Sequence, residues 1–175
     1  MLVTGVGCSH SEKTLPDQHL KVVIIRHGEK PATGDNLSCQ GEGRALQIPA
    51  VIYKKFNKPD YLYVPALEAD KSTSHSRMFQ TATPIAIKYN LTINSKFDGK
   101  DYADVAKSIL KKRGVVLMVW EHSAIPKLAE ALGAVRPPKW GDLDFDSIWI
   151  ITYAAGKASL TIDHEGIIPS TSCSF

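Results

Sequence analysis

The 175-residue sequence lacks several features that would place it in a special class of protein. Its longest apolar run, Gly114 to Trp120, is far shorter than the roughly 18 residues that a membrane span needs. Its 21 Lys and Arg residues barely exceed its 18 Asp and Glu residues, and no long basic run is present. We therefore expect no membrane span and no nucleic-acid partner. The charge balance does not exclude small anionic ligands.

Cysteine is scarce, and its spacing excludes a structural zinc site. The three cysteines, Cys8, Cys39 and Cys173, form no Cys-x-x-Cys pair and have no histidine at a zinc-binding spacing, so no metal is expected. Cys39 and Cys173 both lie in polar loop sequence, where a disulfide would tie down the C-terminal tail. The alternative is two free thiols in a reducing cytosol.

The N-terminus does not form a complete signal peptide. Its apolar stretch is short and has no preceding basic region, although Gly7 before Cys8 is similar to the end of a lipoprotein signal. Gly5 stands where Leu is usual in such signals, so lipidation of Cys8 is left open. We expect residues 1–19 to be a flexible tail, a signal or lipoprotein remnant, and the protein to be periplasmic or otherwise exported, with the cytoplasm as the alternative.

The rest of the chain reads as one globular domain over residues 20–175. Its hydrophobic and charged fractions, 43% and 22%, are ordinary for soluble proteins, and one core usually serves about 100 to 200 residues. Continuous β-branched runs at 21–25 and 114–120 are typical of strands buried on both faces. Further strands are predicted at 60–64, 91–94, 147–153 and 158–162, and helices at 43–56, 78–89, 102–112 and 125–132.

This alternation of strands and helices predicts an α/β fold, a three-layer α/β/α sandwich with a mainly parallel central sheet. The last two strands surround Gly156 and should form an antiparallel hairpin. In such a sheet, ligands bind at the carboxyl ends of the strands, so the residues that follow each buried run are the first candidates for a site.

Two arginines and two histidines are predicted at that edge. Arg26 and His27 follow the first buried run, and His122 follows the run that ends at Trp120. Arg77 lies in the loop after the strand that ends at Val64, directly before a predicted helix. A guanidinium group binds phosphate through two parallel hydrogen bonds, and an imidazole can add a further donor. The cluster therefore indicates a site for a phosphate dianion.

Such a cluster can also carry out phosphoryl transfer without a metal or cofactor. A neutral histidine presents its Nε2 lone pair to phosphorus, so one of the two histidines should attack and form a covalent phospho-enzyme. The other cations would stabilise the charge that develops on the transferred group. The leaving alkoxide needs a proton, which Glu121, Glu29, Asp101 or Asp104 could supply.

These residues resemble the histidine phosphatase superfamily, the phosphoglycerate mutase-like family. The resemblance covers about residues 21 to 135, in the family's order, and its motifs begin with Arg26-His27-Gly28 after a buried strand. Leu37 to Ala45, Ser76 to Ala82 and His122 then match in turn. The resemblance implies that His27 is the phosphorylated nucleophile and that Arg26, Arg77 and His122 bind the phosphate, as in the small phosphatase branch.

The resemblance does not assign the proton donor to a single residue of this sequence. Some branches place an acid about 25 residues beyond the second arginine, where Asp101 and Asp104 lie, and others place Asp directly after the second histidine, where this chain has Ser123. Glu121 fits neither pattern, but at a strand end beside Trp120 its pKa could rise enough for a general acid. We predict Glu121 as the acid, with Asp101 next.

The predicted function is therefore metal-independent hydrolysis of a small phosphomonoester, such as a sugar phosphate, through a phosphohistidine. The alternatives are a phosphomutase of the same family and a phosphate-binding module without turnover. Loops 65–76 and 134–146 should set the substrate but carry no recognisable specificity code, and the sequence leaves the oligomeric state open. The four remaining histidines, which follow no buried strand, are read as solvent-exposed: His10, His19, His75 and His164.

Overall fold

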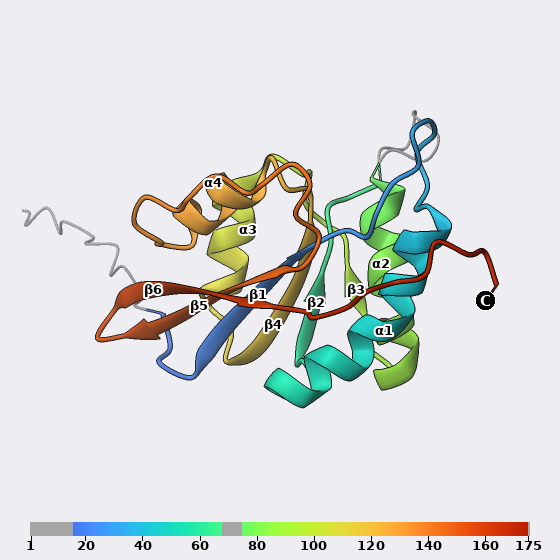
Figure 1. The fold of residues 1–175 in the computed structure, drawn as a ribbon. Coiled ribbons are helices and arrows are strands. Elements are labelled where there is room, and N and C mark those ends of the chain that lie inside the picture. The colour runs from blue at the N-terminus through green and yellow to red at the C-terminus, as the bar shows by residue number, and fades with distance from the viewer. Residues whose placement is uncertain (1–15, 68–74, 175) are drawn as a thin grey trace, which may run out of the picture.

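The computed structural model describes residues 16–67 and 75–174 as a mixed sheet covered by helices on both faces (Figure 1). Its strands are β1 (Leu20–Arg26), β2 (Tyr61–Tyr63), β3 (Ile93–Asn94), β4 (Gly114–Trp120), β5 (Ser147–Ala154) and β6 (Lys157–His164). Its helices are α1 (Cys39–Phe56), α2 (Ser76–Tyr89), α3 (Tyr102–Ile109) and α4 (Ile125–Ala131).

The strand order in the sheet is β3-β2-β4-β1-β5-β6. The pairs β1·β4, β2·β4 and β2·β3 are parallel, whereas β5 pairs antiparallel with β1 and β6 antiparallel with β5. The parallel centre and the final hairpin were both predicted from the sequence. The carboxyl ends of β1, β2 and β4 therefore meet at one edge of the sheet.

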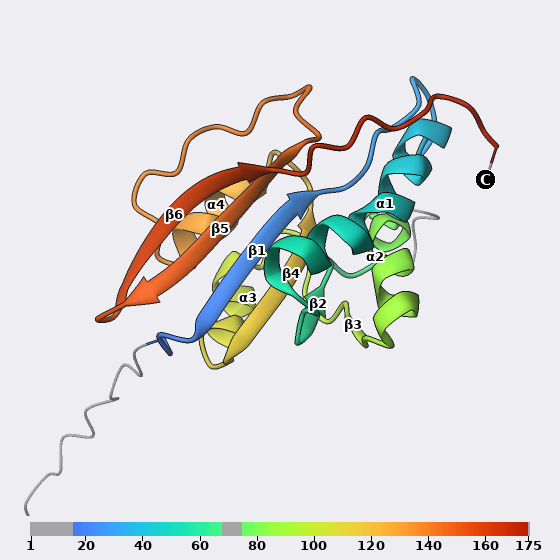
Figure 2. The ribbon, with the colours of Figure 1, turned by 60° about the horizontal axis from the view of Figure 1, so that its bottom comes forward.

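Two separate cores fill the space between the sheet and its helices. Alternate residues of β1 and β4 point to opposite faces, as the two-residue period of a strand requires. Val22 and Val116 pack with α3 and α4 on one face, and Val23 and Leu117 pack with α1 and α2 on the other. Figure 2 shows the two helix pairs on opposite sides of the sheet. This arrangement confirms the predicted three-layer sandwich.

Two helices differ from their predicted bounds by three residues or more, for local reasons. The helix predicted from residue 43 begins at Cys39, because the Ser38 hydroxyl accepts a hydrogen bond from the Gly41 N–H at 3.1 Å and caps it. The helix predicted to reach Lys112 ends at Ile109, and a turn in which the Lys112 N–H donates to the Ile109 carbonyl leads to Gly114. Apolar spacing locates a helix better than it locates its ends.

The C-terminal segment returns to the start of α1, where a disulfide joins Cys39 to Cys173. The segment beyond β6 runs along the side of α1 in both views (Figures 1 and 2). The two cysteines lie 134 residues apart in the sequence, and their Cα atoms are 4.8 Å apart. The disulfide that the sequence left open is therefore present, and it ties the tail to the helix that follows the candidate site.

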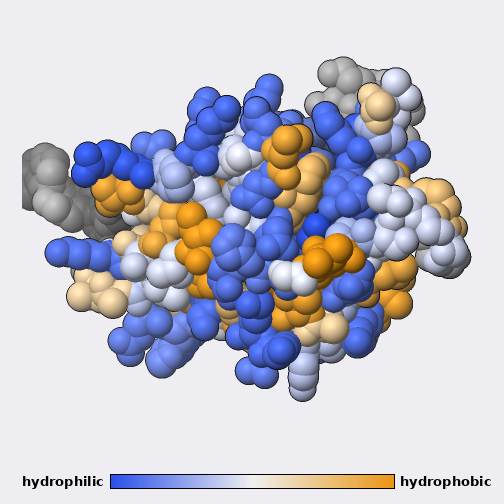
Figure 3. Space-filling model, viewed as in Figure 1, coloured by the Kyte–Doolittle hydropathy of each residue, from blue (hydrophilic) through white to orange (hydrophobic). Residues whose placement is uncertain are grey.

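The surface is mainly hydrophilic on the face shown in Figure 3, where apolar side chains form small groups between polar ones. Within residues 16–67 and 75–174, no helix combines the length and apolar character needed to cross a membrane. The predicted tail falls largely on residues 1–15, which lie outside the described residues, as do Cys8 and His10.

Candidate active site

The candidate site lies where β1 and β4 end side by side. These strands are parallel neighbours, and Arg26 at the end of β1 stands opposite Trp120 at the end of β4. The backbone continues this pairing for one more residue, because the His27 N–H donates to the Trp120 carbonyl at 3.1 Å. The residues after both strands, His27 and His122, are thus brought to the same edge, as the sequence predicts.

His27 is a buried imidazole with a fixed orientation. Only 3% of the residue is exposed, and its Nδ1 lies 2.7 Å from its neighbour's carbonyl, Gly28 O. A carbonyl only accepts hydrogen bonds, so Nδ1 carries the proton and Nε2 keeps its lone pair. Burial, together with the nearby charges of Arg26, Arg77 and His122, lowers the pKa of His27 to about 4, against the opposing Gly28 hydrogen bond. His27 is therefore a neutral imidazole at physiological pH.

Arg26 is held rigidly beside it. Its Nη1 donates to the carbonyls of Asp142 and Asp144 at 2.7 and 3.1 Å, and its guanidinium lies 3.8 Å from the centre of the Phe145 ring. Its Nε, in contrast, is buried without a hydrogen-bond partner among the described residues. The loop between α4 and β5 thus positions the guanidinium.

His122 contributes a second unpaired nitrogen. Its Nδ1 is buried and has no hydrogen-bond partner, while its Nε2 lies 3.6 Å from the Asp142 carboxylate. Burial and the charge of Arg26 lower its pKa, against the opposing charges of Glu121 and Asp142. Of the described residues, only three have such an unpaired buried side-chain atom, and two of these are Arg26 and His122. Buried polar atoms without partners are uncommon, and here two of them belong to candidate site residues.

Arg77 approaches from the first turn of α2. Its Nη2 and Nε donate to the carbonyls of Gly34 and Asn36 at 2.8 and 3.3 Å, and its Nη2 lies 3.8 Å from the Asp35 carboxylate. Its charge still acts on His27. The structure therefore brings all four predicted residues together: Arg26, His27, Arg77 and His122.

Close backbone contacts fix the loop that carries His27. A Cβ atom on Gly28 would lie 2.6 Å from the Gly41 carbonyl oxygen, so only glycine fits between β1 and the first turn of α1. The Gly28 N–H donates to the Thr81 hydroxyl at 2.9 Å, and this hydroxyl donates to the Arg77 carbonyl at 2.8 Å. Thr81 therefore links the two halves of the site. Sequence reasoning matched Thr81 to a family motif but gave it no role.

Glu29, one of the acids considered from the sequence, lies in a buried ion-pair network. Its carboxylate accepts hydrogen bonds from Arg44 Nε and Nη2 at 2.8 to 3.0 Å, and Arg44 Nη1 donates to Glu165 at 2.6 Å. Burial raises the pKa of Glu165 to about 8, against the opposing charge and hydrogen bond of Arg44. The network joins the His27 loop to α1 and the C-terminal segment, and it occupies the Glu29 carboxylate.

The other three candidate acids lie in two different places. Glu121 follows β4 directly and is exposed, and its charge acts on both Arg26 and His122. It lines a hollow of about 250 Å³ beside the end of β4. Asp101 and Asp104 line a separate hollow formed by α3 and α4. Asp98, which sequence reasoning did not single out, lines the Glu121 hollow.

His75 corrects one sequence interpretation, because it is not a solvent-exposed histidine. It is half-buried, its Nδ1 lies 2.7 Å from the Ala66 carbonyl, and its ring borders the Glu121 hollow. The sequence did not indicate this partial burial, because His75 follows no buried strand and directly precedes α2. His19 and His164 are exposed, as predicted, and His10 lies outside the described residues.

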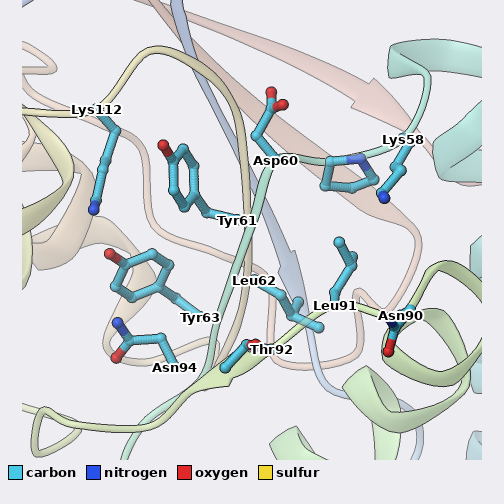
Figure 4. A pocket seen from close by; sticks show the side chains of 11 residues that line it. Lys58, Asp60, Tyr61, Leu62, Tyr63, Asn90, Leu91, Thr92, Asn94 and Lys112 are labelled. Carbon is cyan, nitrogen blue, oxygen red and sulfur yellow. The ribbon is translucent and has the colours of Figure 1, made fainter.

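Other parts of the described structure offer less for catalysis. A hollow of about 610 Å³ lies along β2 and β3 (Figure 4), with Tyr61, Tyr63 and Lys112 on one side and Leu62 and Leu91 on the other. The described residues that line it include no histidine or arginine. Within residues 16–67 and 75–174, no group of His, Cys, Asp and Glu side chains is arranged to hold a metal ion.

Comparison with solved structures identifies the fold. The protein histidine phosphatase SixA complexed with tungstate matches with a TM-score of 0.61 and 15% identity, over 83% of this chain and 97% of that one. A mycobacterial glucosyl-3-phosphoglycerate phosphatase with inorganic phosphate matches at 0.54 and 17%, over 82% and 95%. A Plasmodium falciparum phosphoglycerate mutase matches at 0.54 and 12%, over 81% and 88%. No family model and no curated protein matches the sequence.

These similarities confirm the predicted fold, which is that of the histidine phosphatases and phosphoglycerate mutases. Both phosphatases and a mutase share it, so the fold by itself does not choose between hydrolysis and transfer. That choice depends on the residues of the site.

Proposed function

We propose that this protein is a histidine phosphatase, which hydrolyses a small phosphomonoester through a phosphohistidine at His27. The observation that carries the proposal is the state of His27: a buried neutral imidazole with Nδ1 fixed on Gly28 O, among the charges of Arg26, Arg77 and His122. That arrangement prepares Nε2 as a nucleophile and surrounds it with donors for a phosphate. The shared fold with proteins that bind phosphate or tungstate supports it.

In the first step, Nε2 of His27 forms a bond to phosphorus while the bond from phosphorus to the alcohol oxygen breaks. The bonding electrons leave with that oxygen, which takes a proton from Glu121. Arg26, Arg77 and His122 hold the three equatorial oxygens, whose charge grows in the transition state. In the second step, water gives a proton to the Glu121 carboxylate and attacks phosphorus. The electrons of the N–P bond return to Nε2, and inorganic phosphate leaves.

Glu121 is proposed as the acid because of its place among the described carboxylates. Its charge acts on both Arg26 and His122. The charge of Asp142 does so too, but that exposed carboxylate also lies 3.7 Å from Lys139. Asp101 and Asp104 border a different hollow, and Glu29 is bound by Arg44. Glu121→Gln should reduce hydrolysis of alkyl phosphates strongly and of p-nitrophenyl phosphate much less, because nitrophenolate leaves without a proton. Equal losses on both substrates would return the assignment to Asp98, Asp101 or Asp104.

The proposal favours hydrolysis over two rival functions. A mutase must return the phosphoryl group to an organic acceptor, and a binding module would hold phosphate without turnover. The domain of about 155 residues has little room for the insertions that close a mutase site against water. The test measures the products formed from p-nitrophenyl phosphate in the presence of EDTA, with and without an added alcohol acceptor.

Release of inorganic phosphate in that assay, with no phosphorylated alcohol formed, is the expected result. Arg77→Ala should lower kcat/KM by about a hundredfold or more, as the loss of an oxyanion donor does in other enzymes. Phosphorylated alcohol as the main product would indicate a mutase. Saturable phosphate binding without turnover would indicate a binding module.

Export from the cytoplasm is part of the proposal. The Cys39–Cys173 disulfide supports it, since such bonds persist in oxidising compartments and are rare in the cytosol. Localisation of the tagged full chain by cell fractionation would test it, and recovery in the cytoplasmic fraction with reduced cysteines would contradict it.

A further inference from the structure

The Glu121 hollow adjoins the candidate phosphate site, and its lining includes two acids and no arginine among the described residues. It holds about 250 Å³ and lies between the ends of β2 and β4, the start of α2 and the loop before α3. Two of its lining residues are chain neighbours of the phosphate-binding set, because Glu121 precedes His122 and His75 lies two residues before Arg77. The hollow is therefore bordered by the two segments that carry Arg77 and His122.

His75 is the most strongly fixed polar side chain on its wall. Its backbone has φ 62° and ψ 5°, a left-handed conformation that residues other than glycine rarely adopt. Nδ1 donates to the Ala66 carbonyl at 2.7 Å. The ring also rests on Gly99, where an added Cβ would lie 3.3 Å from His75 Cε1. Backbone strain held by neighbouring contacts is common at functional sites.

These contacts leave Nε2 of His75 for a ligand. The proton lies on Nδ1 because the Ala66 carbonyl can only accept a hydrogen bond, so the neutral ring presents a lone pair at Nε2. Nε2 has no hydrogen-bond partner among the described residues. A hydroxyl group in the hollow could donate to it.

The other polar side chains among the described lining residues are two acids, one lysine and two hydroxyl groups, from Asp98, Glu121, Lys100, Tyr102 and Ser123. Asp98 and Glu121 supply two carboxylates, against one lysine among the described lining residues, Lys100. The aromatic ring of Trp120 forms part of the wall and is fixed there, because its indole N–H donates to the Gly99 carbonyl at 3.0 Å. While Glu121 carries the proton for the leaving oxygen, a leaving group with a carboxylate would still meet the like charge of Asp98, whereas one with hydroxyls would find acceptors in Asp98 and in His75 Nε2.

We propose that this hollow binds the alcohol part of the substrate, a small uncharged polyol or sugar, and that His75 determines specificity by accepting a hydroxyl at Nε2. The inference rests on the proposed phosphatase function and names the substrate class for it. The hollow is smaller than the roughly 300 to 1,000 Å³ of most drug-sized ligand sites, which favours a leaving group of a few carbons over a nucleoside. Carboxylate-bearing esters such as phosphoglycerate are disfavoured.

The test compares glycerol 3-phosphate with 3-phosphoglycerate, which differ mainly in a hydroxymethyl group against a carboxylate. Wild-type kcat/KM should be at least tenfold higher for glycerol 3-phosphate. His75→Asn tolerates the left-handed backbone and can still donate to the Ala66 carbonyl, but it lacks Nε2. This variant should lose about tenfold in kcat/KM for glycerol 3-phosphate, mainly through KM, and less than twofold for p-nitrophenyl phosphate.

Two further variants complete the design. Asp98→Asn removes one carboxylate and should reduce the ratio of kcat/KM for glycerol 3-phosphate over 3-phosphoglycerate by several-fold. His19→Asn, at an exposed position before β1, is the matched control and should change nothing. Equal wild-type rates on the two esters, or an equal loss on p-nitrophenyl phosphate in His75→Asn, would overturn the inference while the phosphatase function stands.

Calorimetric titration separates failure of the inference from failure of the proposed function. Wild-type protein should bind glycerol 3-phosphate more tightly than 3-phosphoglycerate, and His75→Asn should reduce that difference while leaving the Kd for inorganic phosphate unchanged. These measurements hold even if no ester is turned over. Equal affinities, or a weakened Kd for inorganic phosphate in the variant, would contradict a separate alcohol subsite.

Discussion

The hydroxyl of Thr81 accepts the Gly28 N–H at 2.9 Å and so joins α2 to the residue that follows the proposed nucleophile. Because the same hydroxyl donates to the Arg77 carbonyl, one side chain fixes both the His27 loop and the start of the helix that carries the second arginine. This buried hydrogen bond helps to hold together a site whose cationic side chains repel one another.

Thr81→Val keeps the shape of the side chain and removes the hydroxyl, which leaves the Gly28 N–H buried and unpaired. We expect a loss of about 1 to 3 kcal/mol in the free energy of unfolding and at least a tenfold fall in kcat/KM. Thr81→Ser should retain most of both. Thr83 bonds only to the Phe79 carbonyl of its own helix, so Thr83→Val is the control. Equal effects of the two valine substitutions would contradict the linking role of Thr81.

The low pKa of His27 predicts that its ring stays neutral far below neutral pH. Burial is the main cause, and the folded protein should show an imidazole that titrates near pH 4. Proton NMR of the histidine rings, with His27→Gln to assign the signal, measures this directly. Inorganic phosphate should raise the midpoint, because a bound dianion favours the charged imidazolium. A midpoint near 6.5 without phosphate would contradict the buried, cation-flanked position of His27.

Glu165 predicts a dependence of stability on pH. Its pKa is raised to about 8 in the fold by burial, from an ordinary value of 4.5, so the folded state favours the protonated acid. Its contribution to stability is therefore complete below about pH 4.5 and is lost as the pH rises through 8, with a slope of at most about 1.4 kcal/mol per pH unit.

Thermal unfolding between pH 5 and 9 tests this contribution. Glu165→Gln keeps an oxygen to accept from Arg44 and should flatten the decline in Tm, while exposed Glu130→Gln should follow the wild type. Parallel Tm curves for wild type and Glu165→Gln would show that Glu165 does not titrate in this range.

The disulfide between Cys39 and Cys173 predicts a redox-dependent stability. Cys39→Ser/Cys173→Ser should lower the free energy of unfolding by about 2 to 4 kcal/mol, with activity changed less than twofold because neither cysteine is one of the candidate site residues. A reductant should lower the Tm of the wild type alone. Thiol titration of the denatured, unreduced wild type should find only Cys8 free, and reactive Cys39 or Cys173 would contradict the bridge.

The sequence predicted the fold and the clustering of the candidate site residues because both depend on strong local patterns. The β-branched runs of β1 and β4 identify buried neighbouring strands, and the parallel pairing then forces His27 and His122 to one edge. The register of the two strands is enough to place these histidines at one edge, without any knowledge of side-chain contacts.

The supporting residues could not be predicted in the same way. Phe145 and Glu165 meet Arg26 and Arg44 across more than a hundred residues of chain, and no periodicity encodes such contacts. His75 looked like a surface histidine because its contact with the Ala66 carbonyl depends on how a loop folds back. Asp98 was missed since the family distance pointed beyond it, towards Asp101 and Asp104.

The central claim is that His27 becomes phosphorylated, and a rapid-mixing experiment tests it most directly. Wild-type protein is mixed with a labelled phosphomonoester for milliseconds, quenched in alkali, which spares phosphohistidine, and digested for mass spectrometry. The account predicts a phosphoryl group on His27 of the wild type and none on folded His27→Ala, which should also lack turnover. Label on any other residue, or turnover by His27→Ala, would contradict it.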